Sequence, residues 1–582
     1  MMRWMPGYVA AALLAAGTAW AADPEMPARG GTLTYVVGSE IPSLDMHRET
    51  TFGTVHPVRP FYSLLIRLNP ANLQSTTDFV CDLCAGPVPE PTDEGTTYTF
   101  AIRKDARWQG EFYLPNGRTL DQATDAEVSA ALGDRLTRAD IKAVLGSRVT
   151  AHDVAASINK MVDPPERGPS ARRAFFSMVD GATAPDDETL IIKLKFPSTA
   201  FLPALAMPYN SIYPKAIIDK DPAFFAGNVL GSGPFIFTEY QTGAFVSGKR
   251  NPDWYEMGAD GKPLPYLDGF RSIIAEKEAV RIQAIRGDRA GIEFRGFAPK
   301  SRDELVQALG DKITVQESDW NCLLTITPNH KAPYLDNPDA RRALTLAIDR
   351  WGGSKYLSQI AVVRTVGGIV YPHHPLAATK EELEKVAGYW PDLKKSRETA
   401  RELLRKAGVP EGHKIVLANR AVDQPYRIVG TWLVDQWKAI GLDAEQLVEP
   451  SAAFYDNLRT KKRFDVALDF NCQSVANPPA DTAKYISEDA TSIQYGQFID
   501  RKSDELYEAM LRETDPAKQR VKMRAYENYT MDEGAHNFVS LWWYRIVPHR
   551  SYVKGWTVSP SHYINQGLEA VWCVGGKCAD TP

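Results

Sequence analysis

The chain has 582 residues, of which 44% are hydrophobic and 24% charged, and its formal net charge at pH 7 is -5. This length exceeds the size at which one compact core stops growing, so two or three structural units are expected and a single small module is excluded. The small negative charge is spread along the chain, which argues against nucleic acid or an anionic membrane surface as a partner.

Residues 1–21 are predicted to form a cleavable secretory signal peptide. Arg3 supplies a short positive region, an apolar run from Tyr8 to Ala16 follows, and Ala19-Trp20-Ala21 is a small-x-small cleavage site. An uncleaved anchor, which is the alternative, needs about 20 apolar residues. The first cysteine, Cys81, lies too far from the cleavage site for lipid attachment. We therefore expect a periplasmic protein of a Gram-negative bacterium that is not inserted in the membrane.

Strands and helices alternate along the mature chain. Apolar alternation and flanking glycines predict strands at 32–37, 98–102 and 190–196. Apolar spacing and capping residues predict helices at 340–348 behind Asn337, from 392 to Gly408, and at 432–440. Residues 109–148 carry two short helical patterns, at 125–132 and 137–145, and are interpreted as an insertion. The mixture predicts an α/β fold without an internal repeat.

Six cysteines in an exported chain favour disulfides, although six cysteines allow 15 pairings. Cys573 and Cys578 flank a flexible Val-Gly-Gly-Lys loop that could close a local bridge. Cys81 and Cys84 have the C-x-x-C spacing of redox motifs and of half a zinc site. Gly86-Pro87 follows at once, and no second pair completes a metal site. A structural bridge is therefore preferred there over a redox or metal role.

Six groups of short motifs occur in a consistent order along the chain. They are GTLTY at 31–35 with IPSLD at 41–45, FYSLLIRL at 61–68, VTAHDV at 149–154, GSGPF at 231–235, NPDWY at 251–255 with PYLD at 265–268, and NHKAPY at 329–334 with RRAL at 341–344 and AIDR at 347–350. Together they resemble the family 5 extracellular solute-binding proteins, which include dipeptide-, oligopeptide- and nickel-binding components of ABC importers. Met46 replaces the proline that usually ends the second motif, and the fifth group corresponds to a hairpin in the family.

The resemblance implies a two-lobed periplasmic binding protein fold, type II and cluster C-like, with a ligand cleft between the lobes. The implied divisions are lobe I at 30–72, 198–300 and 544–582, an extra subdomain of lobe I at 73–197, and lobe II at 301–543. It also implies the function of a substrate-binding protein that captures a peptide-like or other small organic solute by lobe closure and delivers it to ABC permease transmembrane subunits. A monomer without a cofactor is expected.

The resemblance places eleven ligand-binding candidates along the cleft. They are Ile41, Leu44, Met46, Tyr209, Trp320, Asn321, Phe470, Asn471, Cys472, Ser474 and Tyr495. Stacking of the aromatic members on a flat or apolar ligand is one interpretation, and core packing is the other. The resemblance further implies a disulfide between Cys322 and Cys472, which leaves the other two cysteine pairs local. Two buried free thiols are the alternative.

Ser474 stands where peptide-binding members carry an aspartate, four residues before a proline, that pairs with the amino terminus of the peptide. A hydroxyl lacks the charge-assisted bond of a carboxylate, a difference of about 1 to 2 kcal/mol for one hydrogen bond. An ordinary peptide ligand is therefore doubtful from the sequence. Asp469 and Asp481 lie nearby and could substitute, although solvated surface carboxylates are the more common outcome.

The sequence also bears on two other classes of function, metal binding and catalysis. The sequence YPHHP at 371–375 suggests metal binding, but adjacent histidines point apart and no third ligand is evident, so a solvated loop is preferred. No metalloprotease, nucleophile-elbow, Walker or dinucleotide motif is present, so no catalytic residue and no enzyme are predicted. A ligand-sensing receptor not coupled to import and a secreted hydrolase stay as alternatives.

Overall fold

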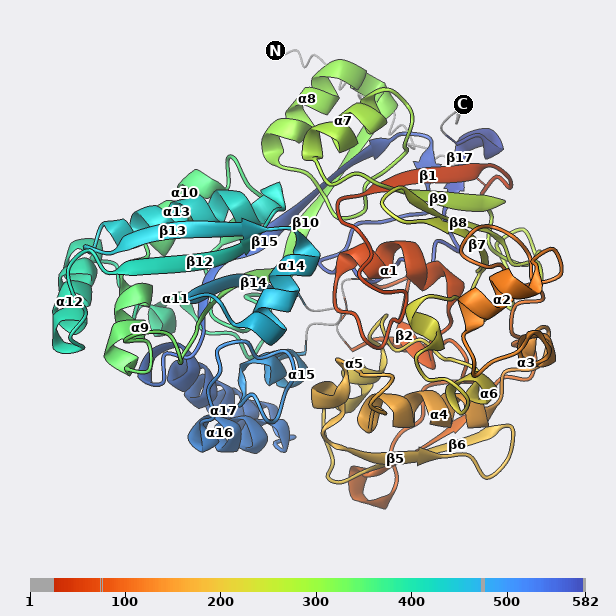
Figure 1. The fold of residues 1–582 in the computed structure, drawn as a ribbon, viewed down its shortest axis with the longest axis horizontal. Helices are drawn as coiled ribbons and strands as arrows, with labels where there is room; N and C mark the ends of the chain where they lie inside the picture. Colours follow the sequence, from red (N-terminus) through yellow and green to blue (C-terminus); the bar gives the residue numbers. More distant parts are fainter. Residues whose placement is uncertain (1–25, 74, 76, 473–476, 579–582) are drawn as a thin grey trace, which may run out of the picture.

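The computed structural model describes residues 26–73, 75, 77–472 and 477–578, which form two lobes side by side (Figure 1). The predicted signal peptide, 1–21, and Ser474 lie outside the described residues. Within the described part, no helix combines the length and hydrophobicity that crossing a bilayer requires.

The first lobe is built on a four-stranded sheet of order β1-β9-β8-β7, in which only β1 and β9 are parallel. Its strands are β1 (Thr32–Val37), β7 (Phe235–Gln241), β8 (Phe245–Arg250) and β9 (Gly269–Ile274). Around it lie α1 (Phe52–Val58), α7 (Glu278–Arg286), α8 (Pro299–Leu309), and the short strands β2 (Ile66–Leu68), β3 (Phe79–Cys81), β16 (Val553–Lys554) and β17 (Trp572–Cys573).

A subdomain with its own three-stranded sheet, of order β4-β6-β5, lies below the first lobe in Figure 1. Its strands are β4 (Thr97–Ala101), β5 (Val179–Thr183) and β6 (Thr189–Leu194). The neighbouring helices are α2 (Asp125–Leu132), α3 (Arg138–Val144), α4 (Ala151–Val162), η3 (Arg173–Phe176), α5 (Phe201–Leu205) and α6 (Lys215–Ile218). The two helical patterns of the predicted insertion are therefore confirmed as α2 and α3.

The second lobe carries a six-stranded mixed sheet of order β11-β15-β10-β14-β12-β13. Its strands are β10 (Ile313–Pro328), β11 (Val363–Thr365), β12 (Lys414–Arg420), β13 (Asp443–Glu449), β14 (Val466–Cys472) and β15 (Phe538–Arg550). Its helices are α9 (Pro338–Leu346), α10 (Arg350–Leu357), α11 (Lys380–Leu383), α12 (Leu393–Lys406), α13 (Ile428–Lys438), α14 (Ser451–Asp456), α15 (Pro478–Asp481), α16 (Arg501–Leu511) and α17 (Pro516–Asn528).

The predicted strands and helices are confirmed, and local chemistry explains their limits. The side chain of Asn337 accepts a hydrogen bond from the backbone N–H of Asp339 at the start of α9, and Asp392 caps α12 in the same way through Lys395. The hairpin expected at 251–268 is not a strand pair. That segment joins β8 to β9 with one isolated bridge, between Met257 and Pro263, and its prolines cannot donate to a ladder.

Strands β10 and β15 connect the two lobes as an antiparallel pair. Ile313–Asp319 pairs with Tyr544–Arg550, and register shifts interrupt this ladder between Asp319 and Thr325, where the pair enters the sheet of the second lobe. The predicted lobe boundaries at 301 and 543/544 fall inside α8 and β15. Because a continuous helix and a continuous strand cross these two boundaries, the division of the chain into lobes stays a prediction.

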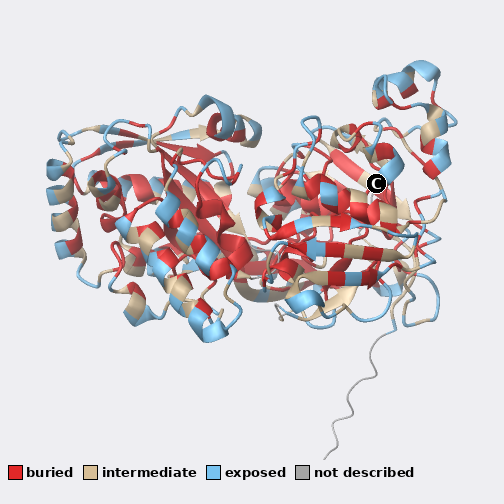
Figure 2. Cartoon of the chain, turned by 90° about the horizontal axis from the view of Figure 1, so that it is seen from below, coloured by how far each residue is buried: buried red, intermediate tan, exposed pale blue. Residues whose placement is uncertain are grey.

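The lobes also meet at the opposite end of their interface, where α16 and α17 approach the subdomain (Figure 1). Ser198 Oγ donates to the carbonyl of Leu511 at 3.4 Å, and Gln519 Nε2 donates to Thr199 Oγ1 at 3.3 Å. Buried residues fill the inside of both lobes and exposed residues lie on the outside (Figure 2), and one buried hydrophobic cluster extends from the first lobe into α16 and α17 of the second. Contact both at the connecting strands and at the far end means that the structure is closed.

Three disulfides join all six cysteines, in the pairs that the sequence analysis considered. They are Cys81–Cys84, Cys322–Cys472 and Cys573–Cys578. The second joins neighbouring strands β10 and β14 across 150 residues. The third closes a loop against the start of β1, where Gly31 has φ +78° and an added Cβ would lie 2.7 Å from the carbonyl oxygen of Gly576. Both ends of the described chain therefore belong to the first lobe.

Candidate ligand-binding site

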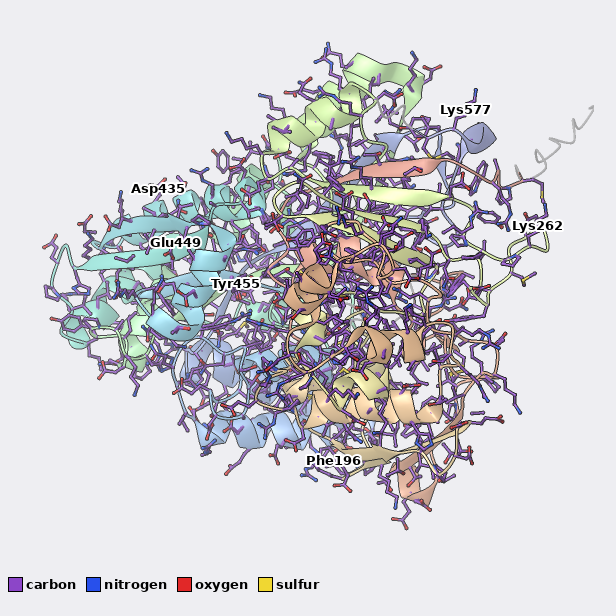
Figure 3. All side chains as sticks on the ribbon, turned by 45° about the vertical axis from the view of Figure 1, so that its right-hand side comes forward. Phe196, Lys262, Asp435, Glu449, Tyr455 and Lys577 are labelled. Carbon is purple, nitrogen blue, oxygen red and sulfur yellow. A yellow bond between two sulfur atoms is a disulfide. The ribbon has the colours of Figure 1, made fainter. Side chains whose placement is uncertain are left out.

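A small cavity lies between the lobes and draws its walls from both. The subdomain and first lobe supply Thr50, Arg172, Phe175, Met207 and Tyr209, and the second lobe supplies Tyr455, Asp469, Phe470, Asn471, Cys472, Asp481, Lys484, Ile493 and Tyr495. Tyr455 is labelled in Figure 3. The cavity has about 60 Å³ of space open to the centre of a water molecule. One water needs roughly 10–15 Å³ on this measure, so a larger solute requires the lobes to separate.

Asp469 is already neutralised within the protein. It lies on β14, is 2% exposed, and accepts a hydrogen bond from Lys484 Nζ at 2.5 Å on Oδ2. Lys484 Nζ also donates to the carbonyl of Phe470 at 2.6 Å, and the hydroxyl of Tyr455 donates to Asp469 Oδ1 at 3.3 Å. Because both carboxylate oxygens have partners, Asp469 is a poor substitute for an amine anchor.

Asp481 differs, because it is buried without a cation. Its Oδ2 accepts the backbone N–H of Asn477 at 2.7 Å, and among the described residues no lysine, arginine or histidine forms an ion pair with it. Burial raises the pKa of this carboxyl well above its usual value. The expectation that Asp469 and Asp481 are solvated surface carboxylates is wrong, since both are at most 3% exposed.

Arg172 is the corresponding unpaired cation on the other wall, just before η3. It is 2% exposed, and one terminal nitrogen donates to the carbonyl of Glu49 at 2.9 Å. Its Nε is buried without a hydrogen-bond partner, and no carboxylate of the described residues forms an ion pair with it. Burial lowers the pKa of Arg172 to about 10, so it stays charged at neutral pH. Arg172 is not among the residues predicted from the sequence, where its only signal is a basic pair just before two phenylalanines.

Of the eleven predicted ligand-binding residues, five line the cavity: Tyr209, Phe470, Asn471, Cys472 and Tyr495. Five others, Ile41, Leu44, Met46, Trp320 and Asn321, are buried elsewhere and do not line it. The indole nitrogen of Trp320, for example, donates to His562 Nδ1 at 2.9 Å. Ser474 lies outside the described residues. Contact of any of the eleven with a ligand stays a prediction.

The two histidines weighed as metal ligands have separate partners. His373 Nε2 lies 3.1 Å from a carboxylate oxygen of Asp319, whereas His374 Nδ1 accepts the N–H of Leu376. One group among the described residues brings three metal-ligand atoms together, Cys322, Cys472 and His562. Its two sulfurs are bonded to each other, so they offer no thiolate.

The family model for bacterial extracellular solute-binding proteins, family 5 Middle, matches residues 82–492, which is well over half of the chain. The chain belongs to this family. The family 5 chain is 25% identical over 273 residues to probable di/tripeptide-binding protein 5 of Pseudomonas aeruginosa, and 26% identical over 246 residues to the glutathione-binding protein GsiB of Pectobacterium atrosepticum. These matches cover 44% and 42% of the chain, and 45% and 44% of the relatives. The family 5 chain thus spans less than half the length of these curated relatives.

Solved structures match this family 5 protein over nearly its whole length. The ABC transporter-associated periplasmic binding protein DppA of Helicobacter pylori, in complex with the peptide STSA, has a TM-score of 0.76 at 20% identity, covering 94% of this chain and 98% of that one. AgaA of A. tumefaciens R10, in complex with agropinic acid, has a TM-score of 0.76 at 18% identity, covering 93% and 99%. At such identity the likeness shows the fold, and the predicted two-lobed α/β fold is confirmed.

Proposed function

We propose that this family 5 protein is the periplasmic substrate-binding component of an ABC importer. In this function it captures a peptide-like or other small organic solute between its lobes and delivers it, as a monomer, to the transmembrane permease subunits. The observation that carries the proposal is the interlobe cavity, whose walls come from both lobes. A solute held there contacts both walls at once, so its binding energy favours the closed arrangement over the open one.

The chemistry of the cavity supports reversible binding rather than catalysis. Asp469 and Lys484 neutralise each other, and the described residues that line the cavity include no serine or histidine that could act as a nucleophile with its base. Aromatic side chains, among them Tyr209, Phe470 and Tyr495, provide apolar contact area for the carbon skeleton of a solute. The named relatives bind di- and tripeptides or glutathione, which supports a solute of comparable size.

The test combines native purification with thermal unfolding. Protein isolated from the periplasm without denaturation is analysed by mass spectrometry for a co-purified small molecule, which is then added back to stripped protein. We expect a solute at 100 times its Kd to stabilise the protein by about 2.7 kcal/mol and to be recovered unchanged. Recovery of a chemical product would establish an enzyme instead.

A transport assay separates import from sensing. Deletion of the gene is expected to abolish uptake of the labelled solute, and re-expression of the protein should restore it. Unimpaired uptake in the deletion strain, together with tight binding in vitro, would favour a sensing receptor. Failure of any co-purified or added solute to stabilise the protein would overturn the proposed function altogether.

A further inference from the structure

Arg172 is a buried cation that lines the interlobe cavity and forms no ion pair with a carboxylate of the described residues. Arg295 and Arg420 are also buried with an Nε that has no hydrogen-bond partner, but they do not line this cavity. Lys484 pairs with Asp469 at 2.5 Å, and Lys160 pairs with Asp45 at 3.2 Å. Arg545 has no carboxylate either, but its guanidinium donates to backbone carbonyls that include those of Arg295, Ser559 and Ser561. Arg172 makes one such bond, to Glu49, and its Nε has no partner.

The carboxylates around the cavity form no ion pair with Arg172. The side chain of Glu49 is buried, its ion pair is with Arg48 at 3.9 Å, and it attracts Arg172 only through space, while burial raises the pKa of its carboxyl. Asp469 is held by Lys484 on the opposite wall. Asp481, which also lines the cavity, has a pKa raised by burial and forms no ion pair with Arg172. Burying a guanidinium without an anion costs free energy. In the closed structure, Arg172 therefore lacks the anionic partner that would offset this cost.

The surroundings of Arg172 hold its guanidinium in one orientation. The bond to the Glu49 carbonyl fixes one terminal nitrogen at 2.9 Å, and the rings of Tyr209 and Phe175 lie 4.7 and 5.3 Å from the guanidinium carbon. The residue lines the cavity on the subdomain wall, facing the second-lobe wall that contains Phe470. A planar cation that lines a narrow space between the lobes and has donors left without a partner is suited to a carboxylate or a similar oxyanion.

We propose that Arg172 binds an anionic group of the solute, which makes the ligand class an organic carboxylate or comparable oxyanion. This inference rests on the proposed function and narrows it. Neutral sugars and metal cations are excluded as the principal ligand, since neither neutralises a buried guanidinium. The anion first binds to Arg172 on the wall of the first lobe, and the second lobe then encloses it. Closure of the lobes therefore completes the removal of the anion from water.

The first test is the chemical nature of the bound molecule. The solute identified by native mass spectrometry is expected to carry a carboxylate, phosphate or sulfonate. A neutral or cationic solute that is nevertheless bound tightly would overturn this inference and leave the proposed function intact. Absence of binding by every solute would overturn both.

The second test compares matched ligands on the wild-type protein by calorimetry. The probes are alanyl-alanine against its amide, gluconate against glucose, benzoate against benzamide, and the co-purified solute against its own amide. For each pair that includes a binder, the charged member is expected to bind at least tenfold more tightly. Equal affinity within the pairs would contradict the role of Arg172.

The third test uses the neighbouring residues as a matched pair of variants. Arg172→Gln is expected to weaken binding of the charged solute at least thirtyfold, whereas Arg173→Gln, at an exposed position of η3, should bind as the wild type does. Arg172→Lys keeps the positive charge but lacks the planar pair of N–H donors of the guanidinium, so it should bind more tightly than Arg172→Gln and less tightly than the wild type. If Arg172→Gln fails to fold, the comparison of Arg172→Lys with wild type on acid and amide decides the question. Equal binding by the two glutamine variants would refute the inference.

Discussion

Lys160 and Arg172 are two buried cations of the same subdomain, and their surroundings are opposite. Lys160 Nζ lies 3.2 Å from Asp45, whose other oxygen accepts the hydroxyl of Tyr213 at 3.0 Å. Arg172 borders the cavity and forms no ion pair with any carboxylate in the part of the chain that the structure describes. The first arrangement is complete within the chain, so it holds the fold together. The arrangement at Arg172 is complete only when a bound ligand supplies an anion. This difference distinguishes a charge that stabilises the fold from a charge that binds a ligand.

The largest expected effect that tests the comparison of Lys160 with Arg172 is on the free energy of unfolding. Lys160→Met leaves the carboxylate of Asp45 buried without its cation, so the free energy of unfolding should fall by roughly 3–5 kcal/mol. Arg172→Met breaks no ion pair within the described chain, so the ligand-free protein should change by less than about 1 kcal/mol in either direction. Urea unfolding of the stripped proteins, followed by circular dichroism, measures both values.

Equal losses in the two variants would break the comparison, because Arg172 would then be part of the structural framework. Ligand provides the internal control. Saturating solute should stabilise Lys160→Met and the wild type by the same amount, whereas Arg172→Met should lose most of that gain.

An intermediate effect is expected from Asp481, through pH. Its carboxyl has a raised pKa in the folded protein, so the wild type loses stability as pH rises from the unfolded value, about 3.9, through the folded value. Asp481→Asn lacks this loss. The variant should therefore gain on the wild type between pH 4 and pH 8, by about 1.4 kcal/mol for each pH unit by which the pKa is raised.

Unfolding midpoints of both proteins across this pH range measure the difference. A variant that instead became relatively weaker as pH rose would mean that Asp481 is ionised and paired in the folded protein, and so resembles Asp45 rather than Arg172. Near pH 3, where the carboxyl is largely protonated in both states, the pH-dependent difference between the two proteins should be nearly absent.

The smallest effect concerns the start of the helix that carries Lys160. Thr150 donates to Asp153 Oδ2 through its backbone N–H at 2.8 Å and through its hydroxyl at 3.0 Å. Thr150→Ala removes the second of these contacts and should cost about 1 kcal/mol, as for other helix-start residues. The same unfolding assay measures it, with Thr150→Ser as the control that retains the hydroxyl. A loss as large as that of Lys160→Met would mean that breaking the buried ion pair does not explain the size of the Lys160 effect.

The sequence was informative where a local pattern determines the structure. Alternation in 32–37 and the cap at Asn337 depend on neighbours within a few residues, and β1 and α9 follow from them. The bridge between Cys322 and Cys472 was accessible only through the family resemblance, because 150 residues separate its ends. The elements that line the cavity were located in the same way, by likeness rather than by physical reasoning from single residues.

The charges of the site could not be assigned from the sequence for a physical reason. Arg172 and Arg173 are chemically identical neighbours, and only the fold decides that the first turns inward. Asp469 appeared free until the structure brought Lys484, which lies 15 residues later, against it. Such pairings depend on how β14 and the following turns pack, which no local periodicity encodes.

The loop closed by Cys573–Cys578, packed against Gly31, has a practical consequence for experiments on closure. Because both ends of the described chain are anchored in one lobe, attaching the protein to a surface through its end would restrain that lobe alone. The other lobe would remain free to swing. Fluorescent labels at exposed Lys577 and Asp435, on opposite lobes in Figure 3, would then report the opening angle of single immobilised molecules.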